Sequence, residues 1–213
     1  MTTSVIELSH TRRLTLRLLA SEHESEYIAL YRDPRVMRKI GEPLSEGTAR
    51  EHFAWALRAN QHPPRIRSSL RKFSDPFQSL PWDRRQLPFQ SLRVAAEVRE
   101  SGRLAAIYSA DRWDPDGSQW EMGVIAPSQA QGHGLAVEGM RALADQLQRL
   151  GVSRLLLRCK ADNLAACRVA RLMGFTGKTA ETELGAVMLW SRLAVAADRW
   201  TPGVRKSTSG GSR

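Results

Sequence analysis

The spacing of apolar residues switches along the chain between the period of a strand and the period of a helix. In residues 12–19, leucines alternate with Thr15 and Arg17, which predicts a half-buried strand. Similar runs, bounded by turn residues such as those at 114–117, predict further strands. These strands are expected at residues 92–99, 103–110, 118–126, 153–159 and 184–195.

Four helices are predicted from the longer period and from capping residues. Ser21 and Glu24 match a capping box, so the first helix is expected to begin at Ser21 and to end before Pro34. In residues 135–150 apolar side chains recur every three or four positions, and Gly151 follows as a stop signal. The other two helices are expected from about residue 45 to 60 and from 163 to 173.

The order of these elements predicts an α/β fold. A strand, two helices, a three-stranded meander and then helix, strand, helix, strand fit one mixed sheet with helices on its faces. A single domain is expected over residues 12–196, between an extension at 1–11 and a segment at 197–213 whose polar, Gly/Ser-rich end predicts a disordered tail. Residues 61–90 hold five prolines among aromatic and basic residues, which predicts a long inserted loop.

Composition narrows the class of protein. No apolar run approaches the ~18 residues of a membrane span, and the first residues do not match a secretory signal. With only two cysteines in 213 residues, a cytoplasmic protein without a disulfide framework is expected. The histidine and cysteine spacing predicts no metal site. The net charge of +10 fits either a surface that attracts anions or an arginine-rich genome, and the sequence leaves both open.

The segment Gln129 to Ala136, QAQGHGLA, carries the clearest chemical signal. It joins a predicted strand to a predicted helix, and Gly132 and Gly134 allow a tight turn close to a ligand. The N–H groups of such a turn and the helix N-terminus together favour a phosphate or pyrophosphate. A dinucleotide-binding fingerprint needs a third glycine where this chain has Val137, so that class is excluded. Two glycines alone also fit a plain turn.

The surrounding residues resemble the GNAT family of N-acetyltransferases. Gln129-x-x-Gly132-x-Gly134 is similar to the family's pyrophosphate loop, and residues 121–126, EMGVIA, are similar to the strand before it. Residues 161–175, ADNLAACRVARLMGF, resemble the family's helix that follows an E-N motif. The opening at 12–40 resembles the branch that acetylates ribosomal-protein N-termini and small-molecule amines. The likeness covers about residues 12–58 and 92–195.

The resemblance implies acetyl-CoA as co-substrate and a direct attack of an amine on its thioester. Acetyl-CoA is expected where the strands 118–126 and 153–159 part, with backbone groups on its pantetheine and loop N–H groups on its pyrophosphate. Asn163 is expected to contact either the pantetheine or a neighbouring backbone. The implied cofactor-binding residues are Val124, Ile125, Ala126, Gln129, Ala130, Gln131, Gly132, His133, Gly134, Leu135, Ala136 and Asn163.

The attacking amine must be neutral, which makes a base useful. A peptide α-amine, with a pKa of ~7.7–8.0, is already partly neutral at pH 7, whereas a lysine amine at ~10.4 is not. Glu121 is the candidate catalytic base, with Glu97 second, and a purely structural Glu121 is the alternative. The family's usual proton donors to the leaving thiolate are replaced by Ala166 and Ala170, which leaves solvent, Cys167 or another group as the donor.

The acceptor is expected to be an amine of a small molecule or of a peptide N-terminus. The resemblance places residues 61–90 where family members shape the acceptor site, so this loop is expected to cover or line it. The alternative function is a non-catalytic acyl-CoA-binding or nucleic-acid-contacting module on the same fold. We expect neither a membrane partner nor a nucleic-acid substrate, and the sequence leaves the formation of a homodimer open.

Overall fold

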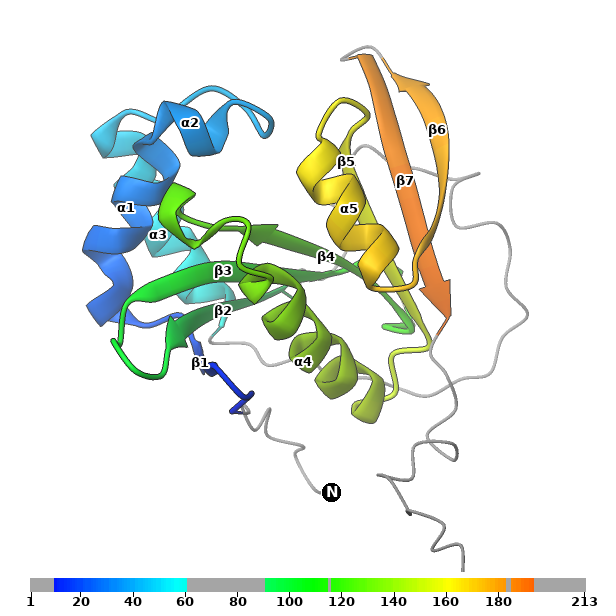
Figure 1. Cartoon of the computed structure of the whole chain (residues 1–213), viewed down its shortest axis with the longest axis horizontal. Coiled ribbons are helices and arrows are strands. Elements are labelled where there is room, and N and C mark those ends of the chain that lie inside the picture. The colour runs from blue at the N-terminus through cyan, green and yellow to red at the C-terminus, as the bar shows by residue number, and fades with distance from the viewer. Residues whose placement is uncertain (1–9, 61–90, 115, 183–184, 194–213) are drawn as a thin grey trace, which may run out of the picture.

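The computed structural model describes residues 10–60, 91–114, 116–182 and 185–193, which build one seven-stranded sheet (Figure 1). The strand order is β1-β2-β3-β4-β5-β7-β6, and every pair is antiparallel except β4 with β5. The predicted mixed, mostly antiparallel sheet is therefore confirmed. The strands are β1 (Leu14–Leu18), β2 (Ser91–Val98), β3 (Leu104–Arg112), β4 (Gln119–Ile125), β5 (Arg154–Lys160), β6 (Thr176–Thr182) and β7 (Gly185–Leu193).

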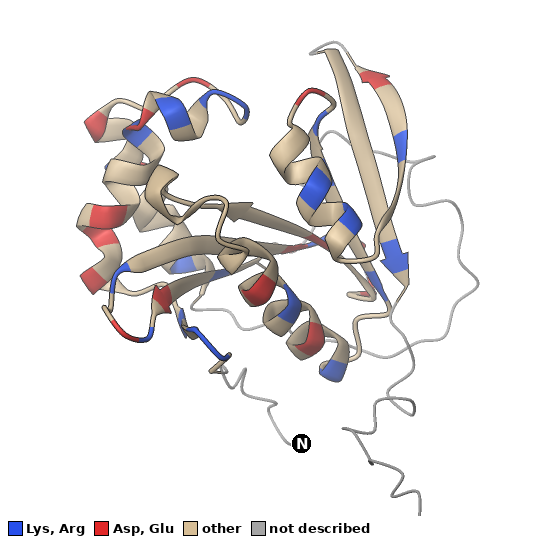
Figure 2. Cartoon of the chain, in the orientation of Figure 1, with Lys and Arg blue, Asp and Glu red and all other residues tan. Residues whose placement is uncertain are grey.

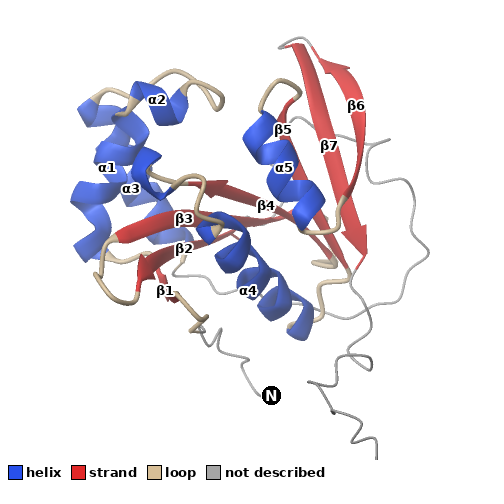
Figure 3. Ribbon diagram, viewed as in Figure 1, coloured by secondary structure: helices blue, strands red, loops and turns tan. Residues whose placement is uncertain are grey.

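Helices cover both faces of the sheet (Figure 3). One face packs against α1 (Glu24–Arg32), α2 (Pro34–Met37) and α3 (Glu46–Ala59), and the other against α4 (Leu135–Arg149) and α5 (Leu164–Leu172). Because successive side chains of a strand point to opposite faces, each strand contributes to both cores. In β4, Trp120 and Met122 join the core under α4 and α5, whereas Ile125 joins the core under α1 and α3.

The start of the first helix differs from the capping box expected at Ser21. A 3-10 turn, η1 (Ser21–His23), comes first, and α1 begins only at Glu24. The buried ring of His23 takes the capping role, since its Nδ1 accepts a hydrogen bond from the backbone N–H of Ala20 at 3.0 Å. The buried imidazole of His23 thus makes the capping hydrogen bond that was expected from the serine hydroxyl. The sequence pattern at this turn does not reveal that exchange.

Two elements were not predicted from the sequence. The short helix α2 follows directly on Asp33, whose carboxylate accepts the N–H of Arg35 at 2.8 Å. The strand β6 has the alternating but mostly exposed composition TGKTAET, and it forms only because β7 pairs with it. The expectations for residues 61–90 and for the tail at 197–213 lie outside the described residues, as does most of the extension at 1–11. No helix among the described residues is long and apolar enough to cross a membrane.

Candidate active site

The two central strands of the sheet part midway along their length. The parallel ladder between β4 and β5 runs from Gln119 with Arg154 to Met122 with Leu157, and then it stops. Beyond that point β4 keeps its partner β3 as far as Ile125, whereas β5 follows β7 away from it (Figure 1). Backbone groups on one edge of Gly123, Val124 and Ile125 are thus left without a partner strand, which is the opening expected for a pantetheine arm.

A cavity of about 570 Å³ fills this opening. Val124 and Leu157 line it from the side of α4 and α5, while Ile107 and Ile125 line it from the side of α1 and α3. The cavity therefore reaches both faces of the sheet at the point where the strands part. Its polar and aromatic lining side chains come from five regions of the chain: Tyr31, Lys39, Arg93, Ser109, Trp113, Arg158, Cys159, Lys160, Asn163 and Thr182.

The glycine loop follows β4 directly and leads into α4. Residues Ser128–Ala130 form a 3-10 turn, and Gly132 and Gly134 then adopt positive φ angles of 82° and 74°. The first intrahelical bond of α4 is made by the N–H of Glu138 to the carbonyl of Gly134, so the N–H groups of Leu135 and Ala136 are orphans of the helix start. Gln129 and the stretch from Gln131 to Gly134 are exposed. This loop therefore offers a free, electropositive N-terminus to an anion.

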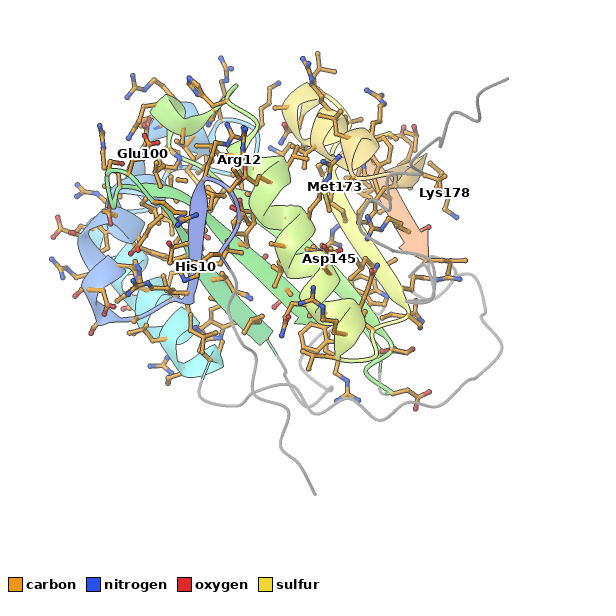
Figure 4. The ribbon with its side chains drawn as sticks, turned by 60° about the horizontal axis from the view of Figure 1, so that its bottom comes forward. His10, Arg12, Glu100, Asp145, Met173 and Lys178 are labelled. Carbon is orange, nitrogen blue, oxygen red and sulfur yellow. The ribbon has the colours of Figure 1, made fainter. Side chains whose placement is uncertain are left out.

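Two side chains fix the loop against the rest of the domain. The amide of Gln131 donates to the carbonyl of Ala126 at 3.0 Å, which ties the loop to the end of β4. Arg13 donates to the carbonyl of His133 at 3.0 Å and to the carboxylate of Glu138 at 2.7 Å. The chain from His10 to Arg13 thus runs beside α4, along a groove that Asp145 also lines (Figure 4).

Asn163 caps α5 and closes one side of the cavity. Its Oδ1 accepts the N–H of Ala166 at 3.1 Å, and its Nδ2 approaches the carbonyl of Lys39 at 3.5 Å. Lys39 also forms an ion pair with Asp162. Of the two roles expected for Asn163, the contact with a neighbouring backbone is therefore present, and the side chain lines the cavity as well.

The candidate base Glu121 lies on β4 two residues before the opening. Its side chain is 14% exposed and forms an ion pair with Arg158 at 3.4 Å, and Arg158 itself lines the cavity. Glu121 therefore reaches the cavity wall through Arg158. Glu97, the second candidate, lies near the C-terminal end of β2, where it contacts the buried His23 at 3.2 Å and Arg17 at 3.6 Å. That environment is a structural one, away from the cavity.

The sequence as a whole matches a known domain. Residues 13–176 match the family model described as an acetyltransferase (GNAT) domain, which is more than half of the chain. The chain belongs to the GNAT acetyltransferase family. The predicted acetyl-CoA-dependent N-acetyltransferase is therefore confirmed at the level of the family. No sequence among the curated proteins matches this chain.

Solved GNAT structures share the fold at low identity. An acetyltransferase from Salmonella typhimurium that modifies the N-terminal serine of ribosomal protein L7/L12 is 17% identical, with a TM-score of 0.65 over 87% of this chain and 97% of its own. Spermidine N-acetyltransferase from Vibrio cholerae, in complex with CoA and spermine, is 17% identical, with a TM-score of 0.63 over 86% and 96%. Aminoglycoside acetyltransferase AAC(6')-Ib with coenzyme A is 15% identical, with a TM-score of 0.62 over 84% and 94%.

This GNAT protein departs from the family pattern near the expected leaving thiolate. Ala166 lines the cavity and carries no proton, and Ala170 is fully buried. Cys167 is 2% exposed, lies outside the cavity lining, and its Sγ lies 3.8 Å from that of Cys159. Cys159 does line the cavity, but burial raises the pKa of its thiol to about 11, so it holds its proton at neutral pH.

Several cavity residues were not found from the sequence. Ser109, Trp113 and Arg158 come together only through the register of β3, β4 and β5, which a single sequence does not reveal. Arg93 could have been singled out from the sequence, because it is a charged residue inside the apolar run of β2, and a buried charge needs a partner. Its side chain is 9% exposed, and its guanidinium pairs with Asp111 at 3.0 Å.

Proposed function

We propose that this GNAT protein transfers the acetyl group of acetyl-CoA to an acceptor with one primary amine, either a peptide N-terminus or a small molecule. The observation that carries the proposal is the end of the β4–β5 ladder at Met122 and Leu157, with a cavity in the opening and a glycine loop directly after β4. The pantetheine would pair with the free edge at Val124, Ile125 and Ala126. The N–H groups from Gly132 to Ala136 would hold the pyrophosphate, because those of Ala130 and Gln131 already donate to the carbonyls of Pro127 and Ser128.

The proposed reaction is a direct transfer. The lone pair of the neutral amine forms a bond to the thioester carbonyl carbon, the C–S bond breaks, and coenzyme A leaves as a thiolate that takes up a proton. As the C–N bond forms, the nitrogen gives up one of its two protons to a base, for which Glu121 beside Arg158 is the candidate. A peptide α-amine is about a tenth neutral at pH 7, so it makes a small demand on such a base.

The charge of the cavity favours an acceptor with one amine over a polyamine. Among the described residues, the charged side chains that line the cavity are all basic: Lys39, Arg93, Arg158 and Lys160. Three of these basic side chains form ion pairs with carboxylates that do not line the cavity, so those carboxylates already have a cationic partner. A second ammonium in this cavity would meet like charges without a free carboxylate. This favours the chemistry of the L7/L12-modifying neighbour over that of the spermidine acetyltransferase.

An acceptor panel tests the proposal. Purified protein and acetyl-CoA are mixed with a serine-initiated peptide, a small monoamine or spermidine, and thiol release and product mass are followed. We expect transfer to the peptide or the monoamine, and at least about 10-fold lower kcat/KM for spermidine. Spermidine as the best acceptor would overturn the assignment of the acceptor. If acetyl-CoA binds but no amine accepts the acetyl group, the non-catalytic module is the better account.

The role of Glu121 is tested with a matched pair of strand carboxylates. If Glu121 is the general base, kcat of the Glu121→Gln variant should be on the order of 100-fold below the wild-type value at pH 7. The difference should shrink above pH 8, because the amine then deprotonates without a base. Glu97→Gln, away from the cavity, should leave kcat of the folded protein unchanged. Equal kcat in the two variants would assign Glu121 a structural role only.

The cellular location follows the same proposal. The two cysteines are free thiols, which is the usual state of cysteines in a reducing compartment. We therefore propose that the protein is cytoplasmic.

A further inference from the structure

A serine of β3 lies at the point where the central strands part. Ser109 pairs with Arg93 of β2 on one side and with Gly123 of β4 on the other. Residues directly opposite in a sheet share a face, so these three form a row on the face covered by α1 and α3. Gly123 is the first residue of β4 past the last pair with β5, and all three residues line the cavity.

The hydroxyl of Ser109 occupies the space that a side chain at position 123 would take. A Cβ built on Gly123 would lie 2.6 Å from Ser109 Oγ, closer than any packed carbon and oxygen can come. The missing side chain of Gly123 therefore leaves this space to the Ser109 hydroxyl, and the backbone angle plays no part because the φ of Gly123 is not positive. Its missing side chain places the hydroxyl directly over β4 at the apex of the opening.

This hydroxyl makes no hydrogen bond to any of the described residues. By contrast, four polar groups of the same cavity either cannot accept a hydrogen bond or already accept one. The guanidinium groups of Arg93 and Arg158 and the indole of Trp113 are donors only. The amide oxygen of Asn163 already accepts from Ala166. Ser109 Oγ is thus a hydrogen-bond acceptor available to a ligand at this end of the cavity.

We propose that Ser109 Oγ accepts an N–H of the acceptor amine and directs its lone pair at the thioester carbonyl. The role rests on the proposed acetyl transfer and adds to it a residue that touches the acceptor. A neutral amine has N–H groups to donate and one lone pair that must stay free for the attack. An oxygen that accepts one N–H orients the nitrogen without blocking that lone pair. No proton moves to or from the serine.

Removal of the hydroxyl gives the first test. Ser109→Ala should lower kcat/KM for the amine acceptor about 10-fold, the usual effect of one neutral hydrogen bond that orients a substrate. The Kd of acetyl-CoA should stay within about twofold of the wild-type value, because the hydroxyl contacts the acceptor and not the cofactor. Ser101→Ala, in the turn between β2 and β3, is the control and should behave as wild type.

The contact with Gly123 gives a second test. In Gly123→Ala the new Cβ would displace the Ser109 hydroxyl, so kcat/KM for the amine should fall as in Ser109→Ala. In the double variant Ser109→Ala/Gly123→Ala the overlap is gone, since the Ser109 Cβ lies 3.9 Å from the new methyl position. The double variant should therefore match Ser109→Ala, with the two losses not adding.

Each outcome decides the proposal. Wild-type turnover with an equal kcat/KM in Ser109→Ala would overturn the role of Ser109 and leave the proposed function standing. An equal loss of acetyl-CoA affinity and of amine turnover, or additive losses in the double variant, would also overturn it. A wild-type protein that binds acetyl-CoA but acetylates no amine would overturn the proposed function and this role together.

Discussion

Glu138 on α4 joins the start of the chain to the helix behind the glycine loop. Its Oε1 accepts hydrogen bonds from the Thr11 hydroxyl at 2.6 Å and from the backbone N–H of Arg13 at 2.8 Å. Its Oε2 accepts from the Arg13 guanidinium at 2.7 Å. Hydrogen bonds to a charged group are the strong ones, so Glu138→Gln should lower the free energy of unfolding by about 1–2 kcal/mol at pH 7. Glu51→Gln, an exposed carboxylate on α3, should change it little.

The effect of Glu138 should depend on pH. Burial raises the pKa of this carboxyl, but the hydrogen bonds from Thr11 and Arg13 outweigh it and hold the pKa below its ordinary value. A lowered native pKa contributes stability above the unfolded pKa of about 4.3, and that stability is lost as the pH falls through the native value. Urea unfolding should show the difference from wild type constant from pH 7 to 5 and shrinking below. A difference that grows in acid would contradict this assignment.

Cys159 should be a slow nucleophile although it lines the cavity. Burial raises the pKa of its thiol to about 11, so at pH 8 roughly one molecule in a thousand carries the thiolate. Alkylation by iodoacetamide, followed by peptide mass, should be at least about 10-fold slower than in the urea-unfolded chain at pH 8. The rate should keep rising about tenfold per pH unit up to pH 10. A plateau below pH 9 would show an activated thiolate and would question a direct attack by the amine.

At the scale of elements, one glycine sets how closely α4 approaches the sheet. A Cβ on Gly139 would overlap the Tyr108 side chain, whose hydroxyl donates to the carbonyl of Leu135 at 3.1 Å. Gly139→Ala should therefore destabilise the protein by about 1–3 kcal/mol, against the usual gain of alanine in a helix. Gly47→Ala on α3, where nothing lies within 4 Å, should instead stabilise by about 0.5–1 kcal/mol. Urea unfolding of both variants checks the opposite signs; equal signs would contradict the packing.

The elements that the sequence predicts are those that carry their own signal. Both α3, capped by Ser45, and α4, with its apolar stripe, lie within a residue or two of their predicted bounds. The strand β6 was missed because its residues are mostly exposed and its pairing with β7 is a tertiary event. The helix α2 has four residues, too few for a period to appear.

The candidate site divides in the same way. The glycine loop is local in the chain, so the sequence could predict its residues together as a binding loop. The acceptor side is built from residues far apart in the chain, such as Tyr31, Arg93 and Ser109, which only the register of β2 and β3 and the packing of α1 bring together. Roles that depend on register, including the contact of Glu121 with Arg158, were therefore beyond a sequence pattern.

At the scale of the whole molecule, positive charge lies near the proposed site of an anionic cofactor. The helix α5 carries arginines and no acidic residue (Figure 2). Lys39 and Lys160 line the cavity. The glycine loop and α4 present a helix N-terminus on the same face of the sheet as α5. The net charge of +10 adds a long-range attraction for polyphosphates. These features together favour acetyl-CoA over an uncharged ligand.

Thermal unfolding with and without acetyl-CoA tests the central claim most directly. A ligand at about 100 times its Kd adds about 2.7 kcal/mol, which for a domain of this size is a rise in Tm of about 5–10 °C. The rise should be lost in Gly132→Val/Gly134→Val and kept in Gly102→Val, whose glycine has a similar φ of 67° in a turn away from the cavity. No rise for the wild-type protein, or an equal rise in all three, would contradict acetyl-CoA binding at this loop.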